Sequence, residues 1–273
     1  MHLSIAIWLN NDMEMLLSIP FGLAIGLVVG TVGGGGAILA LPVLVYVLDE
    51  GVSSATTASL IVVALGASFG AGAQARRGQL CVRIALVFSA PAAVGAYIGT
   101  VATAQVSAKT LILAFVPVLL AAAALTYRRG GDGEREHEDD AGCPSARLGT
   151  AGTAGLFVGA MTGFFGVGGG FLIVPALTLL MGVAMRRAIA TSLAIITLTG
   201  IAALLSHLAD GAEPDWPLTA TLCVAAGAGA VLGSRLGQRL SPATLAHAFG
   251  VVVGLVAVFL LIDVLLLGGP PAS

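Results

Sequence analysis

Two glycine-rich stretches decide the fold of this chain: residues 30–42, GTVGGGGAILALP, and residues 163–175, GFFGVGGGFLIVP. They lie 133 positions apart and align without a gap, and farther on an offset of 134 pairs Gly95 with Gly229. The matches include proline and leucine as well as glycine, and they keep their order. This order indicates an internal repeat, because similar composition alone would not preserve it.

The composition indicates a membrane protein. The 273 residues are 58% hydrophobic and only 10% charged, with a mean hydropathy of +1.03. A soluble domain needs more charge on its surface, whereas crossing a bilayer takes roughly 20 apolar residues per helix. We therefore predict an all-α polytopic membrane protein and exclude a soluble one. The apolar stretches are 15–32, 54–75, 84–103, 110–127, 148–165, 189–208, 218–233 and 243–267.

A charged segment separates the two halves. Residues 128–147 read RRGGDGEREHEDDAGCPSAR, which is typical of a solvated linker. We predict a first transmembrane repeat over residues 1–127, a cytoplasmic linker over 128–147 and a second repeat over 148–273. Each repeat is expected to hold a glycine-broken re-entrant or half-helix pair followed by three transmembrane helices. Whether the pieces beside the break return or cross fully stays open.

Matched loops of the two halves carry opposite charges. Cytoplasmic loops are enriched in Lys and Arg, which places Arg76-Arg77, the linker, Arg186-Arg187 and Arg235/Arg239 in the cytoplasm. Asp49-Glu50, the loop 210–216 and both termini are then outside. The two repeats are accordingly predicted to be inverted, an arrangement common in secondary transporters.

The glycine breaks are the candidate substrate site. A helix that restarts after a break presents unpaired backbone N–H groups, which bind anions without a charged side chain. Hydroxyl groups follow each break and can donate hydrogen bonds to an oxyanion, although such groups also bond their own helix. Arg76 and Arg77 would attract anions to the cytoplasmic mouth. The predicted substrate-binding residues are Gly33, Gly34, Gly35, Gly36, Thr57, Ser59, Gly166, Gly168, Gly169, Gly170, Thr191 and Ser192.

Other residues receive structural interpretations. Glycines spaced by four, at 22/26/30, 155/159/163 and 229/233/237, are predicted to let helices approach closely. Gln74 and His207 occupy the same repeat position and are interpreted as helix-end contacts, with His207 as a proton carrier the alternative. Asp263 is interpreted as an interfacial cap. The three cysteines show no spacing motif, so neither a metal site nor a disulfide framework is expected.

The motif Gly166-Val167-Gly168-Gly169-Gly170-Phe171-Leu172-Ile173-Val174-Pro175, followed by Ala188-Ile189-Ala190-Thr191-Ser192-Leu193, resembles the TauE/SafE sulfite exporter family. The first half repeats it over residues 33–42 and 55–60. The resemblance implies a bacterial inner-membrane transporter that exports sulfite or an organosulfonate by alternating access. A passive anion channel, or a transporter of another small organic acid, remains the alternative.

The sequence and the family resemblance also predict which partners the protein has. No catalytic cluster occurs at membrane depth, so the chain is not expected to be an enzyme. No cofactor and no nucleic acid are expected as partners, and the net charge is −2. The expected partners are a small sulfur-containing anion and the lipid bilayer, while a coupling proton or sodium ion and a homodimer stay open.

Overall fold

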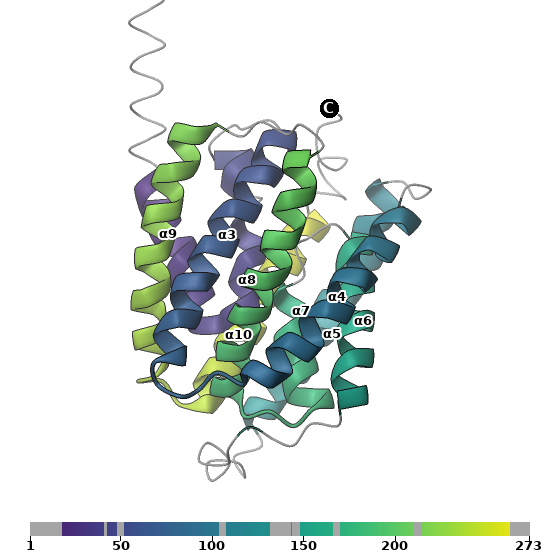
Figure 1. The fold of residues 1–273 in the computed structure, drawn as a ribbon, viewed down its shortest axis with the longest axis vertical. Coiled ribbons are helices and arrows are strands. Elements are labelled where there is room, and N and C mark those ends of the chain that lie inside the picture. The colour runs from purple at the N-terminus through teal and green to yellow at the C-terminus, as the bar shows by residue number, and fades with distance from the viewer. Residues whose placement is uncertain are drawn as a thin grey trace, which may run out of the picture.

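The computed structural model describes residues 18–40, 43–47, 52–103, 108–131, 143, 148–165, 170–209 and 215–262. Within these ranges the secondary structure is helical and contains no strand, as Figure 1 shows. All eight predicted apolar stretches contain a helix. The predicted all-α architecture is therefore confirmed.

The two halves present the same order of elements. The first half contains the helix Ser18–Val32, η1 (Gly33–Leu39), η2 (Val43–Val47), α3 (Val52–Ala75), α4 (Val82–Thr103) and α5 (Ala108–Gly131). The second half contains α6 (Leu148–Phe165), α7 (Gly170–Pro175), η4 (Ala176–Leu180), α8 (Met185–Ala209), α9 (Trp216–Gly237) and α10 (Pro242–Ile262). Since α5 runs to Gly131, the first four residues of the predicted linker are helical.

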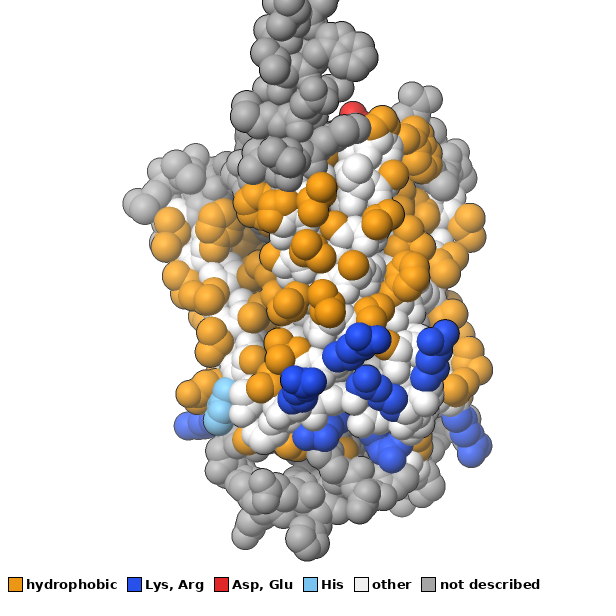
Figure 2. All heavy atoms as spheres, turned by 90° about the vertical axis from the view of Figure 1, so that its left-hand side faces the viewer, with side chains coloured by type: hydrophobic (Ala, Val, Ile, Leu, Met, Phe, Trp, Pro, Cys, Tyr) orange, Lys and Arg blue, Asp and Glu red, His pale blue; other side chains and the backbone are white. Residues whose placement is uncertain are grey.

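Five of these helices are long and apolar enough to cross a membrane: α3, α4, α8, α9 and α10. The 22 residues of α9 rise about 33 Å at 1.5 Å per residue, which matches a hydrocarbon core of about 30 Å. Large apolar side chains cover the outer wall, for example Val224 at 75% exposure and Leu255 at 66% (Figure 2). Such a surface suits lipid, and the protein is a multi-pass membrane protein.

The piece after the second glycine break is much shorter. Residues Gly170–Leu180 form an apolar helix in α7 and η4 that rises about 16 Å, roughly half the hydrocarbon thickness. Gly182 follows with a φ of 65°, a left-handed conformation that glycine adopts without steric cost. The chain can therefore turn there, after a half-helix rather than a full crossing.

Glycine rows bring helices of opposite halves into backbone contact. A Cβ atom on Gly26 would collide with the carbonyl oxygen of Ala226, so the helix Ser18–Val32 lies directly on α9. A Cβ atom on Gly159 would collide in the same way with the carbonyl oxygen of Ala92, which joins α6 to α4. The packing role predicted for the glycines spaced by four is confirmed at these positions.

The remaining long helices also pack across the halves, α3 against α8 and α5 against α10. Helices α3 and α8 run antiparallel: Leu193 lies 3.1 Å from a Cβ position on Gly70, and Ala64 lies 2.9 Å from one on Gly200. These two helices begin at Val52 and Met185, 133 positions apart, and so occupy equivalent places in the repeat. The halves are interleaved rather than separate bundles.

One end of the bundle collects the arginines, and we call it the arginine end. Here α3 and α9 finish and α4, α8 and α10 begin, because Arg187 Nη1 donates to Gly78 O (3.1 Å) and Gln238 Nε2 donates to Gln74 Oε1 (3.0 Å). Figure 2 shows the basic side chains gathered there, with acidic colour at the opposite end. The arginines at this end whose side chains are described are Arg76, Arg77, Arg83, Arg128, Arg186, Arg187, Arg235 and Arg239.

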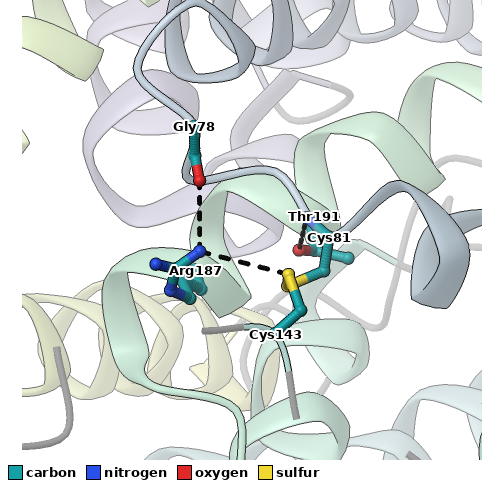
Figure 3. Close-up of a disulfide and its surroundings, with 5 residues drawn as sticks. All are labelled: Gly78, Cys81, Cys143, Arg187 and Thr191. Atoms are coloured by element: carbon teal, nitrogen blue, oxygen red, sulfur yellow. Dashed lines mark hydrogen bonds between the residues drawn. A yellow bond between two sulfur atoms is a disulfide. The ribbon is translucent and has the colours of Figure 1, made fainter. Parts of the chain in front are cut away.

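A disulfide at the arginine end contradicts the expectation that the cysteines are not paired. Cys81, before α4, is bonded to Cys143 of the linker, with their Cα atoms 5.7 Å apart (Figure 3). The expectation of no disulfide was wrong because it rested on spacing, and 62 residues separate the two cysteines. Folding brings the α3–α4 turn and the linker to the same end. Arg187 lies against both, since its Nη1 is also 4.0 Å from Cys143 Sγ.

Candidate functional site

The two glycine breaks meet inside the protein. A Cβ atom on Gly34 would collide with the carbonyl oxygen of Gly170, and one on Gly170 would lie 2.9 Å from the Cα of Gly34. Element η1 packs against α7, α8 and α10, so this meeting point is surrounded by the second half. The structure thus brings together one predicted site residue from each break.

Gly33 joins this site through its backbone conformation. Its φ of 75° lies in the left-handed region, where any residue with a Cβ atom is strained. A Cβ there would sit 2.7 Å from the Oγ of Ser192 and 3.4 Å from the Cα of Ile189. The Ser192 hydroxyl donates to Ile189 O at 2.8 Å, so it must rotate away from that carbonyl to donate to a bound anion.

The other predicted hydroxyl groups differ in the hydrogen bonds that they make. Thr191 Oγ1 accepts a hydrogen bond from the Cys81 amide (3.2 Å), which leaves its own proton available as a donor (Figure 3). Ser59 Oγ donates to Thr56 O at 2.8 Å, as Ser192 does to the equivalent Ile189. Thr57, Thr191 and Ser192 are all completely buried.

Several predicted site residues lie away from the meeting point of the breaks, and others are outside the described part of the chain. Gly36 faces its own half, because a Cβ there would lie 2.5 Å from the Val29 amide, and Gly35 belongs to the same element η1. Arg76 and Arg77 are exposed at the arginine end. The residues outside the described part of the chain are Gly166, Gly168, Gly169 and Asp263; the side chain of His207, in α8, is also outside it.

Aromatic rings that the sequence analysis did not single out bracket the second break. The ring of Phe115 lies 4.8 Å from that of Phe165 and 5.2 Å from that of Phe171, measured between centroids. Phe165 ends α6 and Phe171 is the second residue of α7, so both flank the break in sequence. Phe115 comes from α5 of the other half, and no sequence signal identifies it as their neighbour. All three side chains are buried, so the described surroundings of this break are apolar on this side.

A polar group on the arginine side of the breaks was also missed. Gln74, interpreted from the sequence as a helix-end contact, lies near the end of α3. Its side chain is only 4% exposed and accepts a hydrogen bond from Gln238. Arg186 Nη2 donates to the carbonyl oxygen of Leu240 (2.9 Å) and is partly buried. Only the repeat position of Gln74 could have drawn attention to this group.

The model of the family described as "Sulfite exporter TauE/SafE" matches residues 18–260. The chain belongs to the TauE/SafE family. The match covers every described element except the last residues of α10, and it includes both glycine breaks. The suspected resemblance in the sequence is therefore confirmed over nearly the whole chain.

Curated relatives of this TauE/SafE chain are named as probable membrane transporter proteins. It is 31% identical to a probable membrane transporter protein of Xylella fastidiosa strain 9a5c over 253 residues, which cover 91% of this chain and 95% of the relative. A probable membrane transporter protein of Methanocaldococcus jannaschii is 24% identical over 92% and 98% of the two chains. No solved structure matches the chain significantly. Family and relatives together indicate a membrane transporter rather than an enzyme.

Proposed function

We propose that this protein moves a small anion across the bacterial inner membrane, with sulfite or an organosulfonate as the cargo and export as the direction. The substrate class comes from the family description, which names sulfite. The physical support is the site itself: it is made of backbone and hydroxyl groups, and the described arginines lie at one end of the bundle. An anion at such a site is held by polar N–H and O–H groups without a fixed counter-charge.

One observation carries the proposal: the glycine breaks of the two halves touch, Gly34 against Gly170. Irregular backbone is tolerated at membrane depth only where it is buried in protein or lines a polar cavity. Both breaks would supply backbone N–H groups to one anion, from the start of η1 in the first half and from the start of α7 in the second. Ser192, Thr191, Thr57 and Ser59 would complete the shell.

Alternating access between inverted halves is the proposed mechanism. The antiparallel packing of the equivalent helices α3 and α8 supports inversion, and substrate sites at the interface of inverted repeats are a common transporter design. Rocking one set of helices against the other would expose the meeting point of the breaks to each side in turn. The phenylalanine rings around the second break favour a site closed to water between those two states.

The arginine end is proposed to face the cytoplasm, with both termini outside. Its arginines support this orientation under the positive-inside rule. The Cys81–Cys143 disulfide argues the other way, because disulfides are rare in a reducing cytoplasm. The arginines decide the proposed orientation, because they keep their charge in either compartment, whereas a disulfide can be reduced to two thiols. Reporter fusions after Asp49 and Arg77 test this, and both reporting the same side would reject inversion.

Flux in liposomes tests the transport function. We expect wild-type protein to carry sulfur-35-labelled sulfite faster than empty liposomes do, and Gly170→Ala to reduce that flux strongly, since its Cβ would press on Gly34 and Ile196. Gly254→Ala is the matched control, because a Cβ on Gly254 meets nothing within 4 Å. Equal flux in folded Gly170→Ala and wild type would remove the breaks from the substrate path. Flux through wild type that ignores proton and sodium gradients would favour a channel.

A further inference from the structure

A small polar cavity lies between the glycine breaks and the arginine end. Its volume is about 10 Å³, which is room for roughly one water molecule. The polar residues around it are Gln74, Gln79, Gln238, Arg186 and Thr31, and the remaining lining residues are Ile189, Gly237 and Leu245. Three of the chain's four glutamines meet here, although burying amide groups in a membrane protein is costly. Such a concentration of rare side chains calls for a functional reason.

The position of the cavity relates it to the substrate site. Thr31 precedes Gly33 by two residues, and Ile189 both lines the cavity and lies 3.4 Å from the Cβ position on Gly33. On its other side the cavity is bounded by Gln79 and Arg186, in the α3–α4 turn and at the start of α8. An anion moving from the arginine end to the glycine breaks would reach this cavity first.

The chemistry of the lining favours an oxyanion. Arg186 is the charged residue among the described lining residues, and none of these is acidic. A guanidinium and amide NH₂ groups are the donors that match oxyanion oxygens. The Oε1 atom of Gln79, one of the lining residues, is buried and has no hydrogen-bond partner among the described residues. Turning that amide over would present its NH₂ group to the same space, so this side chain can adapt to an anion.

We propose that this cavity is an oxyanion-binding subsite, where a small anion exchanges water for Arg186 and the glutamine amides before it reaches the glycine breaks. The subsite rests on the proposed transport function and specifies its path. At its present volume the cavity is closed to anything larger than water. The Gln74–Gln238 hydrogen bond joins two lining residues, one in α3 of the first half and one directly after α9 of the second, so separating these helix ends would open the cavity.

The test measures sulfite uptake into liposomes as a function of sulfite concentration. Arg186→Gln removes the charge and keeps an amide, Arg186→Lys keeps the charge, and Arg239→Gln removes an exposed arginine at the same end, outside the cavity. Losing a charge-assisted hydrogen bond of about 1.5–3 kcal/mol raises the apparent KM roughly tenfold or more. We expect that rise for Arg186→Gln, partial rescue by Arg186→Lys, and little change for Arg239→Gln.

Gln238→Glu keeps the proposal testable if Arg186→Gln does not fold. It preserves side-chain shape but places a negative charge in the cavity, so we expect it to raise the KM for sulfite at least as much. Unchanged KM values in folded Arg186→Gln and Gln238→Glu would overturn the subsite while leaving transport intact. Faster sulfite flux in Gln238→Glu would also overturn it, because a negative charge inside an oxyanion subsite should hinder the anion. Wild-type flux no higher than that of empty liposomes would instead reject the proposed function, and the subsite with it.

Discussion

The glycines of the helix interfaces and the glycines of the breaks differ in what their missing side chain allows. Gly26 and Gly159 occupy equivalent positions, lie in regular helices and meet the same kind of partner, a carbonyl oxygen on a helix of the other half. Gly34 and Gly170, in contrast, meet each other at the two breaks. The helix contact thus occurs once in each half, whereas the repeat counterpart of the Gly34–Gly170 contact involves Val167, which lies outside the described residues.

This difference distinguishes the glycines that hold the helices together from the glycines of the candidate substrate site. The two helix interfaces support the fold in the same way in both halves, while the described contact between the breaks lies among unlike residues. The first half contributes the left-handed Gly33, and the second contributes Ser192 and the rings of Phe165 and Phe171. Substitutions at the two kinds of glycine should therefore affect different measurements.

The largest effect is expected at a helix interface. Gly159→Leu would drive a side chain into the backbone of α4 at Ala92. Overpacking costs roughly 1–3 kcal/mol where neighbours can shift, and a facing helix backbone has little freedom to do so. We expect a large drop in the melting temperature in detergent. Gly72→Leu, in an exposed position of α3 with nothing within 4 Å of its Cβ, is the control; equal melting temperatures would contradict the packing role.

A smaller and more local effect is expected at the first break. Gly33→Ala places a Cβ in the left-handed conformation, at a cost of about 1–2 kcal/mol, and presses it on Ser192 Oγ. Removing that oxygen with Ser192→Ala should relieve the steric part. A double-mutant cycle on thermal stability is then expected to give a coupling of about 0.5–1 kcal/mol across the two halves. Strict additivity would show that the two residues do not touch.

Much of the fold follows from the sequence, because hydropathy and an ordered repeat are local properties of the chain. The predicted stretch 148–165 coincides with α6, and the glycines spaced by four pack as expected. Partners across the halves could not be predicted in the same way. Nothing in the spacing of Cys81 and Cys143, or of Gln74 and Gln238, shows that folding joins them. The sequence therefore suggests which residue types form the candidate site, but it does not show which of them are in contact.

The smallest effect is expected at a glycine that serves neither purpose. Gly254 lies inside α10, and a Cβ added there meets nothing within 4 Å. Alanine is the better helix former by about 1 kcal/mol in water, so Gly254→Ala should leave the melting temperature equal or slightly higher. Sulfite flux should not change, because α10 meets η1 through other residues. A marked loss of flux here would mean that glycine flexibility along α10 itself contributes to transport, and the division between interface glycines and break glycines would no longer hold.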